Sequence, residues 1–214
     1  MKSVLITGGT VRLGKAIAER LRAEGWRVIT SSHRADAGAD VIADLTEPMG
    51  AAKLYAAVIK ILGGTPPDAL VNNAALFTGD AATLQAVNLE APKKLTILMA
   101  GRETGVGTIV NILDTKALDA YRCLSTSIDT YLVSKRELAA FTRSSAATFA
   151  ATLRVNGVAP GPVLAPTGVH VKAGETLLDR RPTADDVAAA VSYLLGAESV
   201  TGAILPVDAG QHLI

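Results

Sequence analysis

Short apolar segments alternate with longer segments of helical periodicity along the chain, and this alternation constrains the fold most strongly. Val4–Thr7 is a β-branched run that stops at a glycine pair, and Leu13–Ala23 follows with apolar residues at helical spacing. Strands that are apolar on both faces belong to a parallel sheet that helices cover on both sides. The sequence therefore predicts an α/β fold with one doubly wound domain over residues 1–214.

Seven strands and the helices between them can be placed by this periodicity. The predicted strands are Val4–Thr7, Arg27–Ser31, Asp40–Ala43, Ala69–Val71, Thr108–Leu113, Arg154–Val158 and Ala203–Val207. The predicted helices are Leu13–Ala23, Glu47–Leu62, Ala81–Ala100, Tyr131–Leu153 and Thr183–Leu195. Asp36–Asp40 leaves little room for a helix between the second and third strands. The irregular, proline-containing stretch 160–182 predicts a short substrate loop.

Composition excludes several classes of function. The net charge of +1 and the 49% of hydrophobic residues exclude a disordered chain and argue against an electrostatic nucleic-acid binder. One cysteine, Cys123, excludes a disulfide framework, and three scattered histidines make a metal site improbable. Since no apolar run reaches the length of a signal-peptide core or a membrane helix, we expect a cytoplasmic protein that binds no membrane.

The turn after the first strand, Thr7–Lys15, is rich in glycine and opens a helix. Backbone N–H groups and the helix dipole at such a turn favour a phosphate group. Gly9–Lys15 fits the first seven positions of the P-loop pattern GxxxxGK[ST]. Ala16, however, stands where a P-loop needs a hydroxyl group to hold magnesium. The pattern TGxxxxxG, which ends at Gly14, fits the same turn, and the motifs that follow decide between the two patterns.

Further motifs follow this turn in a fixed order. They are Asn72–Ala75, Asn88 within Val-Asn-Leu, Tyr131–Lys135 as YxxxK, Val158–Pro162 with its Pro-Gly pair, and Val207–Gly210 as Val-Asp-Ala-Gly. Together with the glycine turn they resemble the short-chain dehydrogenase/reductase family over essentially the whole chain. The resemblance implies a Rossmann-type domain with a mainly parallel seven-stranded sheet, and an oxidoreductase that uses a nicotinamide dinucleotide.

Tyr131 and Lys135 carry the expected acid–base chemistry. They stand at i and i+4, so they share one face of a helix. An adjacent ammonium lowers the pKa of a phenol, which then donates a proton more readily at neutral pH. In the family the lysine also holds the nicotinamide ribose, and the asparagine at Asn88 supports the proton relay. Without the other motifs, a surface pair at i and i+4 with no functional consequence would be the simpler interpretation of Tyr131 and Lys135.

The end of the second strand selects the cofactor. Ser31 and Ser32 precede His33 and Arg34, and an arginine there suits the 2′-phosphate of NADPH. Asp36 is an acid close to the end of this strand, so NAD stays open as the cofactor. The alternative interpretation of Arg34 is a loop charge that is solvated and binds nothing. The resemblance carries cofactor contacts over to the following positions: Gly8, Thr10, Arg12, Leu13, Gly14, His33, Arg34, Asp44, Leu45, Asn73, Ala74, Ala75, Tyr131, Lys135, Pro160, Gly161 and Val163.

The substrate site departs from the family pattern at Asp114. Where the family has a serine, the chain has this acid, 17 residues before Tyr131 and a few residues farther from it than the serine usually lies. A carboxylate would repel the alkoxide that forms when a ketone is reduced. A carboxylic acid suits a nitrogen that needs a proton, so we expect reduction of a C=N bond.

The pteridine reductase branch of the family resembles the chain at these points. It implies substrate contacts from Arg12, Phe77, Asp114 and Tyr131, with the aromatic ring stacked on a pterin. Each residue has a structural alternative: Phe77 as a core aromatic, Arg12 as a solvated charge, Asp114 as a turn cap. Ser125 or Ser127 of the inserted segment 115–130 is an alternative partner of Tyr131.

Three functions remain open. The first is an NADPH-dependent reductase of a dihydropterin or dihydrofolate C=N bond. The second is a carbonyl reductase acting on a ketone or 3-oxoacyl group, and the third is a catalytically silent NADP(H) sensor on the same fold. In the family, the helices that carry Asn88 and Tyr131 pack across a two-fold axis, and the alanine-rich stretch Ala139–Ala151 fits this. We expect a homodimer or homotetramer, and a monomeric mass in solution would contradict it.

Overall fold

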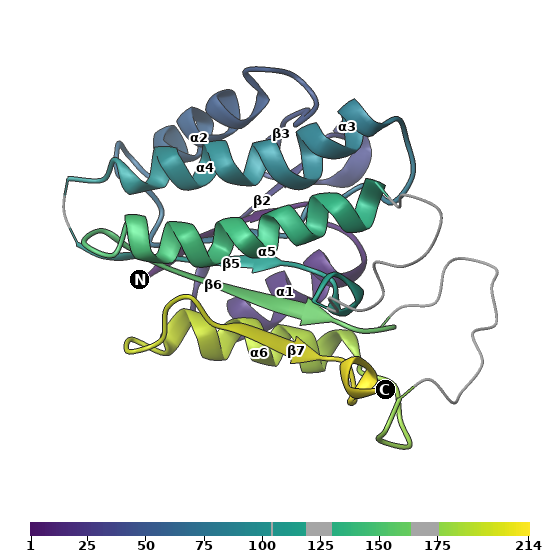
Figure 1. Ribbon diagram of the computed structural model, residues 1–214. Coiled ribbons are helices and arrows are strands. Elements are labelled where there is room, and N and C mark those ends of the chain that lie inside the picture. Colours follow the sequence, from purple (N-terminus) through teal and green to yellow (C-terminus); the bar gives the residue numbers. More distant parts are fainter. Residues whose placement is uncertain (104, 119–129, 164–175) are drawn as a thin grey trace.

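Neighbouring strands of the sheet all run parallel, in the order β3-β2-β1-β4-β5-β6-β7 (Figure 1). The computed structural model describes residues 1–103, 105–118, 130–163 and 176–214. The chain order reverses between β1 and β4, which lie side by side in the sheet. A reversal of this kind opens a crevice at the carboxyl ends of the strands, where α/β proteins bind ligands. The predicted parallel α/β architecture is confirmed.

The elements follow the predicted alternation. The strands are β1 (Ser3–Thr7), β2 (Arg27–Ser32), β3 (Val41–Ile42), β4 (Ala69–Asn72), β5 (Gly107–Ile112), β6 (Leu153–Pro160) and β7 (Ile204–Val207). The α-helices of the described residues are α1 (Arg12–Ala23), α2 (Gly50–Ile61), α3 (Ala81–Gln85), α4 (Ala91–Ala100), α5 (Thr130–Thr148) and α6 (Ala184–Gly196). A π-helical turn, Ala86–Glu90, joins α3 to α4, and short 3-10 turns lie at Ala35–Ala37, Thr115–Ala117 and Gln211–Leu213. The 3-10 turn Ala35–Ala37 is three residues long, which agrees with the prediction that little room is left for a helix between β2 and β3.

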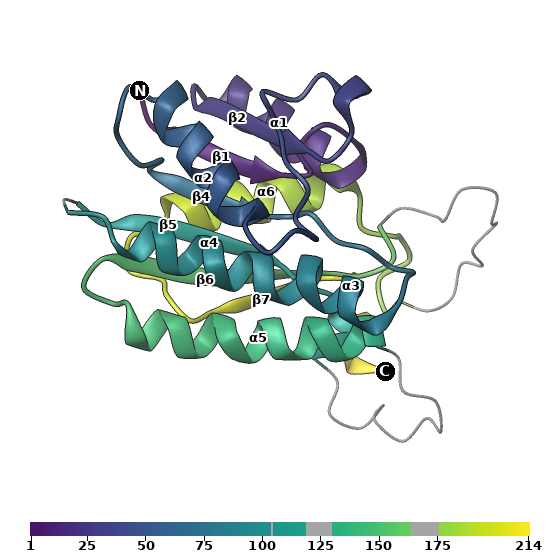
Figure 2. The ribbon, with the colours of Figure 1, turned by 90° about the horizontal axis from the view of Figure 1, so that it is seen from above.

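Two layers of helices cover the sheet (Figure 2). Val4 and Ile6 of β1 pack with α1 and α6 on one face, whereas Leu5 packs with α2, α4 and α5 on the other. Successive side chains of a strand point to opposite faces of the sheet. All three residues are fully buried because helices cover both faces. A strand buried on both sides must be apolar at every position, which explains the continuous runs in the sequence.

The end of α5 differs from the sequence prediction. The helix was expected to continue to Leu153 but ends at Thr148, and Leu153 begins β6. The backbone N–H groups of Thr152 and Leu153 both donate to the carbonyl of Phe149, at 2.9 and 2.8 Å, and close a tight turn. Because this turn needs neither glycine nor proline, no residue in the sequence marks it.

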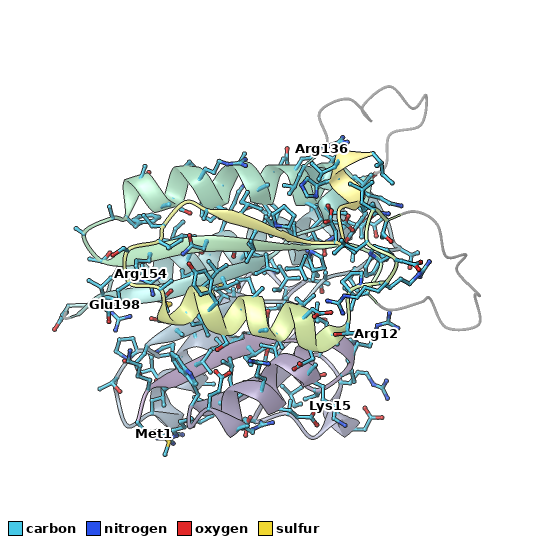
Figure 3. The ribbon with its side chains drawn as sticks, turned by 90° about the horizontal axis from the view of Figure 1, so that it is seen from below. Met1, Arg12, Lys15, Arg136, Arg154 and Glu198 are labelled. Atoms are coloured by element: carbon cyan, nitrogen blue, oxygen red, sulfur yellow. The ribbon has the colours of Figure 1, made fainter. Side chains whose placement is uncertain are left out.

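Arg154 ties β6 to the end of α6, at the edge of the molecule opposite to Arg12 (Figure 3). One guanidinium nitrogen, Nη1, donates to the carbonyls of Leu194, Ala197 and Val200 at 2.8–3.1 Å, and Nη2 donates to that of Leu195 at 2.9 Å. The last carbonyls of a helix have no partner within the helix, so these bonds satisfy them. Burial lowers the pKa of Arg154, and nearby Glu198 opposes that effect.

Replacing Arg154 should therefore destabilise the fold. We expect Arg154→Met to lower the free energy of unfolding by about 2–3 kcal/mol, because the carbonyls of Leu194 and Leu195 in the last turn of α6 lose their donor. Urea denaturation measures this. Arg27→Met is a suitable control, since Arg27 is exposed and donates to one carbonyl, that of Ile61. Equal losses for the two variants would show that the capping bonds of Arg154 contribute nothing.

Candidate active site

The glycine turn lies beside the end of β4, at the point where the strand order reverses. Gly8 has a left-handed backbone, with φ of 63°. A Cβ at Gly14 would lie 2.1 Å from the carbonyl oxygen of Gly8, so only glycine allows the helix to approach the strand end this closely. This tight turn, with the N-terminus of α1 beside it, fits a phosphate group of a dinucleotide.

Asn73 fixes the turn to β4. Its Nδ2 donates to the carbonyls of Thr7 and Gly8, both at 3.0 Å. The hydroxyl of Thr7 in return accepts from the backbone N–H groups of Asn73 and Ala74, both at 3.0 Å. The side chain of Asn73 thus holds the two edges of the crevice together.

Arg12 occupies an uncommon backbone conformation at the start of α1. Its φ is 49°, and the first turn of α1 has no acidic residue. A cation at a helix N-terminus is unfavourable unless an anion is bound there. The exposed guanidinium of Arg12 is therefore available to a phosphate or to a substrate at the crevice.

Arg34 follows β2 but is already paired. Its Nε and Nη2 donate to the carboxylate oxygens of Asp36 at 3.0 and 2.7 Å. This pairing raises the pKa of Arg34 and lowers that of Asp36. Both side chains are largely exposed, at 61% and 70%, so the ion pair contributes little and can give way to a phosphate.

The other predicted cofactor residues also lie at the carboxyl ends of strands. Thr10 and Leu13 belong to the glycine turn and the first turn of α1, His33 follows β2, Asp44 and Leu45 follow β3, Ala74 and Ala75 follow β4, and Pro160, Gly161 and Val163 end or follow β6. Hydrogen bonds from Thr46 lower the pKa of Asp44, which keeps its carboxylate ionised. In a parallel sheet these strand ends share one edge, so the structure brings the predicted positions to one side of the molecule.

Tyr131, Asp114 and Phe77 meet at this edge. The phenol of Tyr131 on α5 donates to Oδ2 of Asp114, which follows β5, at 3.0 Å. The ring of Phe77 stacks on that of Tyr131, with centroids 4.5 Å apart and an interplanar angle of 26°. Phe77 is 69% exposed, which rules out its alternative reading as a core aromatic.

Asp114 also caps the turn Thr115–Ala117. Its Oδ1 accepts from the backbone N–H of Lys116 at 2.9 Å, while Oδ2 takes the phenol. The capping role and the contact with Tyr131 therefore coexist, one on each carboxylate oxygen. Ser125 and Ser127, the alternative partners of the phenol, lie outside the described residues.

Lys135 lies beneath this pair and is almost fully buried. Its Nζ donates to the carbonyl of Ile112 at 2.7 Å and lies 5.9 Å from the centre of the Tyr131 ring. Burial lowers the pKa of Lys135 to about 8, although the charge of Asp114 acts in the opposite direction. The ammonium is thus a buried charge close to the phenol.

Asn88 lies in the π-helical turn and uses its amide for structure. Its Oδ1 accepts from the backbone N–H of Leu76 at 2.8 Å, and its Nδ2 donates to the carbonyl of Leu76 at 2.9 Å and to the hydroxyl of Ser134 at 3.2 Å. Leu76 precedes Phe77, and Ser134 lies between Tyr131 and Lys135. Asn88 therefore sets the stacking residue against α5.

Sequence reasoning missed a buried network that links β4, β5 and α5. Asn72 donates to Asn111 at 2.8 Å, and Asn111 donates to Thr142 at 2.9 Å. Sequence reasoning also gave no role to Thr115, whose hydroxyl donates to Asp208. Polar residues inside otherwise apolar segments were the available signal, but their partners lie far away in the sequence.

Metal and membrane features can be checked in the part of the chain that the structure describes. There, no three side chains of histidine, cysteine, aspartate or glutamate gather where they could hold a metal ion. Likewise, none of the described helices is both long enough and apolar enough to cross a membrane.

Comparison with known proteins gives relatives with several different activities. Pteridine reductase 1 of Leishmania tarentolae is 29% identical over 280 residues, which cover 98% of this chain and 96% of that protein. A Streptomyces violaceoruber protein assigned as ketoacyl reductase 2 of the granaticin polyketide synthase is 31% identical over 245 residues, with 98% and 96% covered. The crystal structure of the alternative dihydrofolate reductase 1 FolM from Brucella canis, complexed with NADP, has a TM-score of 0.86 and 31% identity, and covers 100% of this chain and 95% of that one.

A family model described as enoyl-(acyl carrier protein) reductase matches residues 11–212. That range contains the last part of the glycine turn with Gly14, the Tyr131–Lys135 pair and the motif at Asp208. The match and the relatives at 31% identity agree with the resemblance of the motifs. The chain belongs to the short-chain dehydrogenase/reductase family.

Proposed function

We propose that the protein is an NADPH-dependent reductase of a pterin-like C=N bond, such as that of a dihydropterin or dihydrofolate. The observation that carries this proposal is the hydrogen bond between Tyr131 and Asp114, beside the exposed ring of Phe77. The pteridine reductase and dihydrofolate reductase relatives support the same substrate class.

The crevice fits NADPH. The glycine turn and Arg12 would hold the pyrophosphate, and Arg34 would hold the 2′-phosphate. Lys135 lies on α5 near Tyr131, and its ammonium reaches the end of β5. This ammonium would hold the nicotinamide ribose. When bound, NADPH supplies a hydride to the carbon of the C=N bond. Solved relatives carry NADP or NADPH, which agrees with this cofactor.

Tyr131 and Asp114 handle the proton. As the carbon is reduced, the substrate nitrogen takes the phenol proton of Tyr131, and the carboxylate of Asp114 passes a proton from solvent to the phenolate to replace it. The 3.0 Å separation of the two oxygens allows a proton to pass in either direction. The positive charge of Lys135 stabilises the phenolate that forms during the transfer.

Phe77 and Tyr131 form a flat aromatic surface for the substrate. Two rings stacked 4.5 Å apart, one of them 69% exposed, offer a face on which a bicyclic pterin can stack. Arg12 lies at the same edge and can donate to the ring nitrogens or the carbonyl group of a pterin. A simple ketone uses neither feature.

A carbonyl reductase is the second candidate. The granaticin relative supports it, since it is assigned to ketoacyl reduction and matches the chain over almost its full length. The Tyr131–Lys135 pair serves either reaction. Asp114 distinguishes them, because an ionised carboxylate opposes a developing alkoxide and assists a nitrogen that takes a proton.

Asp114→Asn provides the direct test of the substrate class. We expect the rate of dihydropterin reduction to fall roughly 100-fold, as is typical when a side chain that transfers protons in an acid–base step is removed. NADPH oxidation with a panel of dihydropterins, dihydrofolate and small ketones measures it. Asp185→Asn is the matched control, since Asp185 is exposed on α6 and pairs with Arg20. Unchanged pterin reduction in Asp114→Asn, or activity with ketones alone, would contradict the proposal.

Arg34 and Asp36 should have opposite effects on cofactor preference. We expect Arg34→Ala to raise the KM for NADPH roughly 10–100-fold, because a charge-assisted hydrogen bond to the phosphate is lost. Asp36→Asn should lower that KM, because the carboxylate no longer competes for Arg34. Steady-state kinetics with NADPH and NADH checks both. A parallel change in the KM for NADH would place Arg34 outside the phosphate site.

The buried ammonium predicts a pH limit. Because the pKa of Lys135 is about 8, its charged form is present below that pH and is lost above it. We expect kcat/KM for reduction to fall as the pH rises through about 8. Since the charge of Asp114 raises the pKa of Lys135, Asp114→Asn should move this limb to lower pH. A limb that stays in place in Asp114→Asn would assign it to another group.

A further inference from the structure

Asp208, directly after β7, gathers four hydrogen bonds near the active site. Its Oδ2 accepts from the hydroxyl of Thr115 at 2.5 Å and from the backbone N–H and ring Nδ1 of His212 at 2.9 and 2.8 Å. Its Oδ1 accepts from the backbone N–H of Gly210 at 3.0 Å. Burial would raise the pKa of Asp208, but these bonds outweigh burial and hold the pKa below its usual value. The carboxylate is therefore ionised and shared by two segments of the chain.

One of these segments is the C-terminal turn, Gln211–Leu213, which lies at the side of the sheet where β6 and β7 end (Figure 1). Because a carboxylate only accepts hydrogen bonds, the ring of His212 carries its proton on Nδ1. Gly161 makes room for the arrangement, since a Cβ there would lie 2.6 Å from the Cβ of Asp208. The Pro-Gly motif after β6 and the Val-Asp-Ala-Gly motif after β7 thus meet at one carboxylate.

The other segment is the turn that carries Asp114. Thr115 is the next residue, is 2% exposed and opens the turn Thr115–Ala117 that Asp114 caps. The hydroxyl of Thr115 is bound to Asp208, and the carboxylate of Asp114 is bound to Tyr131. Two adjacent residues therefore link the C-terminal turn to the phenol.

We propose that Thr115, Asp208 and His212 are positioning residues, which hold the Asp114 turn so that its carboxylate stays on the hydroxyl of Tyr131. The importance of this arrangement for turnover rests on the proposed function, but the contact itself can be tested without any substrate. A threonine that only packs against its surroundings would be replaceable by valine, which has nearly the same shape.

The first test follows the ionisation of Tyr131. The difference in phenolate absorbance between the parent protein and its Tyr131→Phe variant isolates this titration from those of the other tyrosines. Asp114 and Lys135 are the charged groups of the described residues placed beside the phenol. Asp114 favours the neutral phenol through its charge and its acceptor oxygen, so Asp114→Asn should move the titration to lower pH.

Thr115→Val should move the titration of Tyr131 in the same direction as Asp114→Asn, although it leaves the carboxylate in place. Thr115→Ser keeps a hydroxyl and should restore the parent titration. Thr108→Val is the matched control, because Thr108 is buried on β5 and its hydroxyl has no hydrogen-bond partner among the described residues. A parent-like titration in folded Thr115→Val, or the same shift in Thr108→Val, would overturn the proposal.

The second test uses turnover. We expect Thr115→Val to lower kcat about 10-fold, less than the 100-fold that a 1 Å misplacement of a catalytic group can produce, with little change in KM. Thr115→Ser should recover most of the loss. A rise in KM with unchanged kcat would point to substrate binding and would contradict a positioning role.

His212→Gln covers the case in which Thr115→Val does not fold. The ring of His212 is about one-third exposed, so its replacement disturbs the core less. We expect a smaller shift of the Tyr131 titration in the same direction, and no shift would overturn the proposal. If the titration of Tyr131 shifts while no dihydropterin is reduced, the positioning role stands and the proposed substrate fails. If dihydropterins are reduced while the titration does not move, the proposed substrate stands and the positioning role fails.

Discussion

The contact between the glycine turn and β4 is the constraint on which the rest of the site depends. A doubly wound sheet brings the ends of β1 and β4 together, but it leaves polar backbone groups at both ends without strand partners. The hydroxyl of Thr7 and the amide of Asn73 satisfy these groups mutually, through bonds of 3.0 Å. The crevice is thereby held open in one shape, and the elements that follow β4 and β5 can be placed against it.

The sequence predicts those parts of the site that local patterns specify. The glycine turn, the Tyr131–Lys135 pair and the acid at Asp114 each follow from a strand end or from helical spacing. The resemblance to the pteridine reductase branch predicted that Phe77, after the Asn72–Ala75 motif, stacks on a pterin. The exposed ring of Phe77 leaves that role open to test. Arg34 was predicted as the cation after β2 that selects NADPH, and Asp36 left NAD open as the cofactor. The ion pair between Arg34 and Asp36 was not predicted, although two residues that are close in sequence and opposite in charge were the signal for it.

The remaining features depend on contacts between distant segments, which no local pattern encodes. Thr115 and Asp208 are 93 positions apart, and Asn88 reaches Ser134 across 46. The end of α5 belongs to the same class, because the pairing of Leu153 with Gly107 of β5 overrides a helical sequence. In each case a buried polar group or a strand partner decides the local structure, and its identity becomes visible only in three dimensions.

Charge balance at the phenol gives the strongest argument on the reaction. A serine at the position of Asp114 would leave the Lys135 ammonium as the charge beside Tyr131, and that arrangement favours an alkoxide. With Asp114 present, the phenol lies between a buried cation and an anion, and a second anion on the substrate would be opposed. An imine nitrogen is more basic than a carbonyl oxygen, so it takes its proton earlier and develops less negative charge during hydride transfer. The charge pattern of this site therefore opposes an imine less than it opposes a ketone.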